Sequence, residues 1–250
     1  MALSRRELLE KAGLLGVALG LSQCWPGLAG ASAIDLDLRA QLEQCKPRLQ
    51  PLEALMAGNQ RYMAAWAAAG DAASPELRMQ ALQLAYGESG CEIDPKALAQ
   101  GQRPWSAVLT CADSRVPLEW LFNTGDGELF GVRSAGNTAF NEGVASLEYA
   151  VANLEVPLIV VLGHSGCGAV TAAMAEATLT PLLEDLVTPI RASFVAGNNL
   201  TEAIKVNACY AAAQLPKRSE LLQRAQASGK LKIQPAYFDI SSGQVSLLLV

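Results

Sequence analysis

Beyond residue 103, short apolar runs alternate along the chain with segments of helical periodicity. The runs at 107–110, 129–132 and 158–162 contain no charged residue, and such uninterrupted runs are typical of strands buried on both faces of a sheet. Between 140 and 154, apolar residues recur every three or four positions, which predicts a helix. Strands that alternate with helices predict an α/β fold with a mainly parallel central sheet flanked by helices.

The segment before this core, residues 34–103, has a different pattern. It is rich in alanine, leucine and glutamine, and its apolar positions fall at helical spacing, which predicts an N-terminal helical arm. A Gly-Asp-Ala-Ala stretch interrupts the pattern, and Ser74 followed by Pro75 is a typical start for another helix. The arm is therefore expected to consist of helices separated by this break.

The C-terminal end has a third pattern. A mostly apolar segment at 236–240, a glycine-containing turn and a second mostly apolar segment at 245–250 predict a β-hairpin. Residues 34–250 are numerous enough for one domain with a sizeable core. We expect the sheet core of this single domain to occupy residues 104–250.

The first 33 residues have the features of an export signal rather than of a folded domain. An arginine pair at residues 5–6 precedes the short uncharged stretch 12–21, and the small residues of 31–33 resemble a cleavage site. The arginine pair is similar to a twin-arginine signal, which predicts export to the periplasm or an equivalent extracytoplasmic compartment. Two alternatives remain: an ordinary amphipathic helix, and a lipid anchor at Cys24.

Composition narrows the class of protein. Hydrophobic residues make up 51% of the chain and charged residues 17%, which is too apolar for a disordered protein. No apolar run reaches 18 residues, so a permanent membrane-spanning bundle is excluded. The formal net charge of −5 argues against nucleic acid as a main partner, because phosphate binding needs clustered lysine and arginine.

Two loops place metal-ligand residue types at the ends of predicted strands. Cys111 follows the first strand, whereas His164, the only histidine of the chain, and Cys167 follow the strand at 158–162. Because the carboxyl ends of parallel strands meet at one edge of a sheet, these three side chains can converge. Two thiolates and one imidazole suit Zn²⁺, and a site with three protein ligands keeps its fourth position for water. Zinc-bound water loses its proton near pH 7, which predicts catalysis by zinc-bound hydroxide.

Other interpretations of these residues are weighed against that site. Cysteine is often simply a buried core residue. The zinc site could also be structural and closed by a fourth ligand, for which the candidates are Cys45, Cys91 and Cys209; whether these three form disulfides stays open. A cysteine hydrolase would use Cys111 as nucleophile and His164 as base, but would leave the other residues of both loops without a role.

Asp113 and Arg115 lie two residues apart in the first loop. On a solvated surface they would be an ordinary ion pair of little energetic value. Beside a cation, the arginine would keep the carboxylate ionised and oriented. Asp113 could then accept a hydrogen bond from zinc-bound hydroxide, or bind the metal itself and close the site, so it is a candidate for both a catalytic residue and a metal ligand.

At these residues the sequence resembles the β-class carbonic anhydrases. The two most specific motifs are Cys-Ala-Asp-Ser-Arg at 111–115 and His-Ser-Gly-Cys-Gly at 164–168. The resemblance extends from about residue 50 to 250, which is nearly all of the expected mature chain. Further matching segments are 58–62, 133–137, 146–151 and the hairpin at 237–245.

The resemblance implies a zinc ion held by Cys111, His164 and Cys167, with Asp113 and Arg115 as a catalytic dyad. It implies reversible hydration of CO₂ to bicarbonate and a proton. It also implies a homodimer or a multiple of dimers. Whether the zinc site is open or closed at physiological pH stays undecided at this point.

Two positions depart from the family's usual pattern, and two other functions remain open. Ser134 stands where the family usually has asparagine, and Glu128 where it usually has aspartate, which puts the packing of the loops in question. A sister hydrolase of carbon disulfide or carbonyl sulfide shares the scaffold and the metal residues. A non-catalytic zinc protein that serves as a binding partner is the second alternative.

Overall fold

A five-stranded sheet forms the centre of the computed structural model, which describes residues 45–47, 50–87, 95–175, 178–195 and 197–249. The strand order is β2-β1-β3-β4-β5, in which the first four strands are parallel and β5 is antiparallel to β4. This arrangement confirms the predicted α/β fold with a mainly parallel sheet. The strands are β1 (Ser106–Cys111), β2 (Leu129–Ser134), β3 (Leu158–His164), β4 (Lys232–Asp239) and β5 (Gln244–Leu247).

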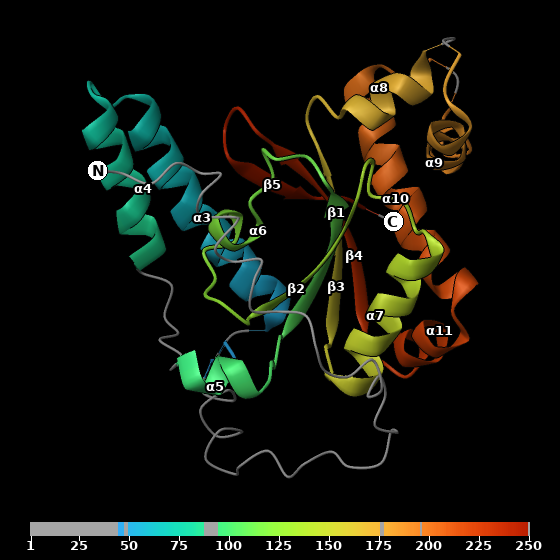
Figure 1. Cartoon of the computed structure of the whole chain (residues 1–250), viewed down its shortest axis with the longest axis horizontal. Helices are drawn as coiled ribbons and strands as arrows, with labels where there is room; N and C mark the ends of the chain where they lie inside the picture. The colour runs from blue at the N-terminus through green and yellow to red at the C-terminus, as the bar shows by residue number, and fades with distance from the viewer. Residues whose placement is uncertain (1–44, 48–49, 88–94, 176–177, 196, 250) are drawn as a thin grey trace, which may run out of the picture. The chain divides into compact units, whose positions relative to one another are not determined.

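Helices cover both faces of the sheet. Helices α7, α10 and α11 lie on one face, and α3 and α6 lie on the other (Figure 1). The helices are α3 (Pro51–Gly70), α4 (Pro75–Gly87), α5 (Pro95–Gln100), α6 (Leu118–Leu121), α7 (Asn141–Asn153), α8 (Gly168–Met174), α9 (Pro181–Arg191), α10 (Leu200–Arg218) and α11 (Glu220–Ala227).

Strand β3 shows why the strands of the core are apolar without interruption. Successive side chains of a strand point to opposite faces of the sheet. Ile159 and Val161 pack into the core beneath α7, α10 and α11, whereas Val160 and Leu162 pack into the core beneath α3 and α6. All seven residues of β3 are buried. A strand covered on both faces has no position for a polar alternation, as the sequence pattern indicated.

The predicted break in the helical arm is present between α3 and α4. The Ser74 hydroxyl accepts a hydrogen bond from the backbone N–H of Leu77 at 3.3 Å, and Pro75 is the first residue of α4. Residues 1–44, with the expected export signal and Cys24, lie outside the described residues. No helix in the described part of the chain is long and apolar enough to cross a membrane.

The C-terminal hairpin is formed by β4 and β5, as predicted, but β4 begins earlier than its apolar run. Residues 232–235 already pair with β3, although the first three are exposed or only partly buried and the fourth is a proline. Asn59 of α3 fastens the hairpin to the arm. Its amide group donates to the carbonyl of Gly243 at 2.9 Å, and its carbonyl accepts from the N–H of Val245 at 2.8 Å. The arm and the sheet are therefore joined through buried hydrogen bonds.

Gly58 allows α3 to lie directly against the end of α6. A Cβ atom at this position would lie 1.8 Å from the backbone oxygen of Phe122. We expect Gly58→Ala to lower the free energy of unfolding by about 1–3 kcal/mol or more, because the backbone has to shift. Gly70→Ala in the same helix is the control, since nothing lies within 4 Å of its Cβ position. Equal urea midpoints for the two variants would contradict this packing.

Candidate metal centre

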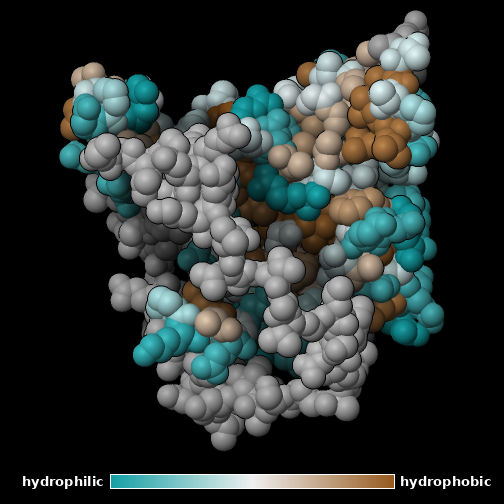
Figure 2. Space-filling view, viewed as in Figure 1, coloured by the Kyte–Doolittle hydropathy of each residue, from teal (hydrophilic) through white to brown (hydrophobic). Residues whose placement is uncertain are grey.

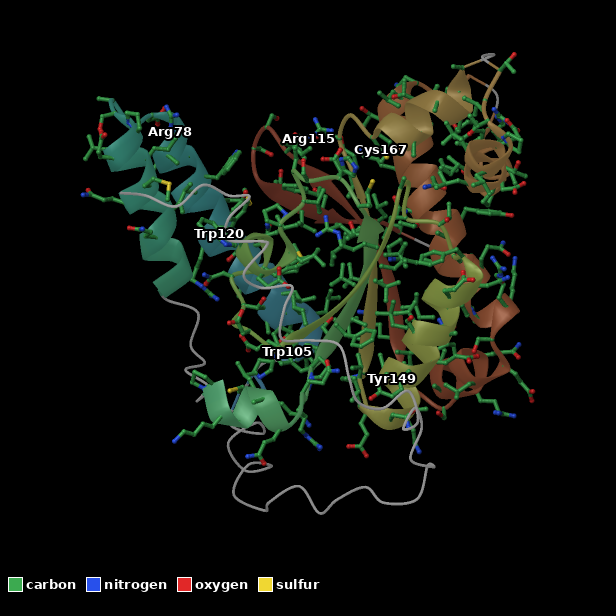
Figure 3. All side chains as sticks on the ribbon, viewed as in Figure 1. Arg78, Trp105, Arg115, Trp120, Tyr149 and Cys167 are labelled. Carbon is green, nitrogen blue, oxygen red and sulfur yellow. The ribbon has the colours of Figure 1, made fainter. Side chains whose placement is uncertain are left out.

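The two loops singled out from the sequence meet at one edge of the sheet. Cys111 is the last residue of β1, His164 is the last residue of β3, and Cys167 directly precedes α8. Gly166, with a φ of 64°, makes the turn that brings Cys167 back over the strand ends. Figure 3 shows Cys167 beside Arg115 at this edge, and the Arg115 guanidinium donates to the Gly166 carbonyl at 3.1 Å.

The structure brings Cys111, His164 and Cys167 into one buried group. One ligand atom from each residue lies within 4.8 Å of the other two, and the two sulfur atoms are 4.0 Å apart. Two thiolates bound to zinc at about 2.3 Å with a tetrahedral angle are about 3.8 Å apart. The sulfur positions therefore already fit a tetrahedral zinc ion.

The imidazole of His164 is oriented as a metal ligand. Its Nδ1 lies 3.0 Å from the Ser165 carbonyl, which fixes the tautomer that carries the proton on Nδ1. Its Nε2 atom is buried and has no hydrogen-bond partner in the described residues. Ser165 is itself held by its hydroxyl, which accepts from the N–H of Ile240 at 3.0 Å. A buried ring nitrogen that faces two thiols without a partner is well explained by a metal ion.

The contact between the two cysteine sulfurs shifts their pKa values in opposite directions. The pKa of Cys111 is lowered, first because of its hydrogen-bond contact with the Cys167 sulfur and also because His164 and the N–H of Gly136 interact with it. The same contact with Cys111, together with burial, raises the pKa of Cys167. Metal ligation needs thiolates. The lowered pKa of Cys111 favours the thiolate form that a metal ligand needs, and a bound divalent cation would favour the thiolate form of Cys167 as well.

The candidates for a fourth thiolate ligand are not part of this group where the structure describes them. Cys209 lies on α10, and its sulfur is 3.8 Å from the Leu249 carbonyl. Cys45 forms a disulfide, whereas Cys111, Cys167 and Cys209 are free. Cys91 lies outside the described residues. The described part of the chain therefore provides three ligands, the number typical of a catalytic zinc site.

Asp113 faces the same space and is held by Arg115. Its Oδ1 accepts from the backbone N–H and the Nε of Arg115, both at 2.9 Å, and its Oδ2 accepts from the Nη2 of Arg115 at 2.7 Å. Oδ2 also lies 3.8 Å from the Nε2 of His164. These hydrogen bonds from Arg115 hold the pKa of Asp113 well below its ordinary value, even though partial burial opposes the shift. The carboxylate is therefore ionised and aimed at the edge of the metal group.

Arg133 and Gly136 also support the loop, and the sequence alone did not indicate these roles. The Arg133 guanidinium donates to the carbonyls of Cys111 and Asp113, at 3.1 and 2.8 Å. The N–H of Gly136 donates to the Cys111 sulfur at 3.3 Å. Both residues lie in or after β2, in a segment that matched the family but carries no ligand residue type. Only the pairing of β2 with β1 would have indicated their role.

The two unusual positions, Ser134 and Glu128, differ in how their side chains are accommodated. The Ser134 carbonyl accepts from the N–H of Ala112 at 3.0 Å, and this contact involves no side chain. Glu128 is buried, and its Oε1 accepts from the indole N–H of Trp105 at 3.0 Å. Burial raises the pKa of Glu128. Glu128 is thus accommodated by local hydrogen bonds, whereas Ser134 pairs with Cys111 across β1 and β2, and its buried hydroxyl has no hydrogen-bond partner in the described residues.

Comparison with known proteins identifies the family. A family profile described as carbonic anhydrase matches residues 106–245, which is more than half of the chain. The chain belongs to the β-carbonic anhydrase family. A carbonic anhydrase of Mycolicibacterium smegmatis is 37% identical over 201 residues, covering 76% of this chain and 94% of that relative. A carbonic anhydrase of Pseudomonas aeruginosa is 35% identical, covering 61% and 77%.

Solved structures of β-carbonic anhydrases share the fold. The enzyme of Coccomyxa, solved with acetazolamide, superimposes with a TM-score of 0.56 at 26% identity, covering 72% of this chain and 87% of that one. A tetrameric β-carbonic anhydrase of Sordaria macrospora also gives a TM-score of 0.56, at 25% identity, and covers 62% and 85%. Zinc is therefore the cofactor that both the family and the Cys-His-Cys group indicate.

Proposed function

We propose that this protein is a zinc-dependent carbonic anhydrase that converts CO₂ reversibly to bicarbonate and a proton. The observation that carries this proposal is the convergence of Cys111, His164 and Cys167, with the Nε2 of His164 buried and unpartnered. A zinc ion bound there would lower the pKa of a coordinated water to near 7 and so supply hydroxide under mild conditions.

The chain's own residues perform the remaining tasks. Cys111, His164 and Cys167 hold the metal, and the buried Nδ1–H of His164 keeps the imidazole in the ligating tautomer. Asp113, ionised by its contacts with Arg115, accepts a hydrogen bond at the open side of the site and orients the attacking group. The hydrogen bonds from Arg115 to both carboxylate oxygens support an arrangement in which Asp113 does not bind the metal. Release of Asp113 from Arg115 would free it to bind the metal.

No imidazole is left to carry the released proton. His164 is the only histidine of the chain, and both of its ring nitrogens are committed in this scheme. Proton transfer through water to buffer is therefore the proposed route, and its rate depends on the concentration of buffer base.

Turnover should respond to the buffer. At constant pH and ionic strength, kcat is expected to rise and saturate with the concentration of a ring-methylated imidazole, which is hindered from binding a metal. The physical reason is that a base with a pKa near the working pH transfers protons best. Stopped-flow measurement of CO₂ hydration against buffer concentration checks this. A flat response would mean that the chain has its own proton carrier.

Zinc content and stopped-flow CO₂ hydration of the purified protein test the proposal directly. One zinc per chain with rapid CO₂ hydration supports it. Rapid hydrolysis of carbon disulfide or carbonyl sulfide with slow CO₂ hydration would assign the sister activity instead. Bound zinc without any of these activities would leave the non-catalytic alternative.

We propose further that the protein assembles as a homodimer or a multiple of dimers. The enzyme of Sordaria macrospora is described as tetrameric. In a single chain, Leu182 of α9 is 83% exposed, and Met174 and Leu183 nearby are also exposed. Figure 2 shows apolar surface over α8 and α9. Exposed apolar patches are typical of interaction surfaces. Light scattering after size-exclusion chromatography measures the mass of the assembly.

Export through a twin-arginine route remains a proposal that rests on the first 33 residues. It is supported by the arginine pair at residues 5–6 and the short uncharged stretch that follows. Cell fractionation of the full chain, with and without lysines in place of both arginines, distinguishes export from retention. Mass spectrometry of the mature N-terminus distinguishes a cleaved signal from a lipid anchor at Cys24.

A further inference from the structure

The backbone of Gly136 links the proposed metal group to a helix that is distant in the sequence. The N–H of Gly136 donates to the sulfur of Cys111 at 3.3 Å. The carbonyl of the same glycine accepts a hydrogen bond from the Nδ2 of Asn207, at 2.8 Å. Asn207 lies in α10, 71 residues away in the sequence. Through Gly136, α10 is thus connected to a sulfur atom of the proposed zinc site.

The backbone conformation of Gly136 depends on contacts with other residues. Its φ of 81° lies in the left-handed region, which other residues rarely adopt. A Cβ atom there would lie 2.5 Å from the Cδ1 of Ile190 and 3.1 Å from the Cβ of Ala169, so the space also requires glycine. Glycine restricts its own backbone less than any other residue. The direction of its N–H is therefore set by what holds its peptide groups.

Asn207 is a polar exception on an apolar helix face. It is 1% exposed, and the neighbouring buried residues Ala203, Ala208 and Ala211 are apolar. A buried amide destabilises the folded protein unless it is hydrogen-bonded. Packing alone gives no reason for an amide at this position. The hydrogen bond to Gly136 supplies one.

We propose that Asn207 is a positioning residue for the zinc site, which acts by holding Gly136 so that its N–H meets the Cys111 sulfur. The inference rests on the proposed zinc function and extends it to a residue outside both loops. A hydrogen bond to a ligating thiolate fixes its orientation and tunes its donor strength. Loss of such a supporting partner typically weakens metal binding about 10- to 100-fold.

The test compares two buried asparagines in the purified holoenzyme. Asn207→Leu removes the amide donor, and the small pocket beside Asn207 gives the larger side chain room. Asn59→Leu is the matched control, because Asn59 is equally buried and bonds to the backbone of α6 and the hairpin rather than to either loop. Zinc affinity is measured by competition with a chelating indicator. The thiolate-to-cobalt charge-transfer band of the cobalt-substituted protein reports on the sulfur ligands.

We expect Asn207→Leu to bind zinc about 10- to 100-fold more weakly and to alter the cobalt band, whereas Asn59→Leu loses stability without either change. If Asn207→Leu does not fold, Asn207→Ala carries the same expectation. A zinc affinity within twofold of the unmodified protein would overturn the inference, as would an equal loss in Asn59→Leu. If the unmodified protein binds no zinc, the proposed function fails first, and the inference fails with it.

Discussion

Replacing Cys167 by alanine is expected to abolish both zinc binding and CO₂ hydration. The substitution removes one of three ligands from a fully buried group and leaves only Cys111 and His164. Water that is not bound to zinc keeps a pKa near 15.7, so kcat/KM should fall by about 10³-fold or more. Zinc content and stopped-flow hydration are measured on the same preparation.

Cys209→Ala is the matched control for this loss. Cys209 is also a free cysteine, but it lies on α10 and its sulfur contacts the Leu249 carbonyl. The control should keep one zinc per chain and its full activity. Loss of zinc from Cys209→Ala would make it a fourth ligand and the site structural. Retention of zinc and activity by Cys167→Ala would remove that residue from the site altogether.

Asp113→Asn is expected to keep zinc and to lose activity. The amide preserves the shape of the side chain and a hydrogen bond from Arg115, but the group that faces the metal site is no longer an anion. General acid–base groups contribute typically about 10²- to 10⁴-fold to a rate, and a loss in this range is expected for kcat/KM. Because Arg115 holds the pKa of Asp113 well below its usual range, the carboxylate is ionised at every pH of a normal assay.

Asp126→Asn is the control, because Asp126 is an exposed aspartate between α6 and β2. Its zinc content and kcat/KM should equal those of the unmodified protein. The same comparison separates an enzyme from a non-catalytic zinc protein. A zinc-loaded Asp113→Asn variant with activity within twofold of the unmodified protein would show that the carboxylate has no part in the reaction. It would then be only the partner of Arg115 in a surface ion pair.

The parts of the fold that could be predicted are those in which one residue type repeats at a fixed period. The run at 158–162 indicated a strand buried on both faces because a charged residue there would be buried without a partner. The start of β4 could not be predicted in this way. Residues 232–235 owe their strand conformation to pairing with β3, and their own sequence contains lysine, glutamine and proline.

Some residues of the candidate site could likewise be predicted from the sequence, and others could not. Cys111, His164 and Cys167 could be found because few other chemistries use these residue types after strands. Arg133, Gly136 and Asn207 could not be found, because arginine, glycine and asparagine occur everywhere and their role depends on contacts between distant segments. Their contacts run through backbone atoms, which leave no side-chain pattern along the sequence.

The buried amide of Asn59 limits how far the chain can be shortened from its N-terminal side. It bonds to the turn and the last strand of the β4–β5 hairpin, which completes one edge of the sheet. The first helix of the arm is thus fastened to the sheet core, although it contributes no residue to the metal group. A shortened form of the protein that still folds therefore has to begin before α3. This start lies upstream of residues 106–245, which the family profile matches.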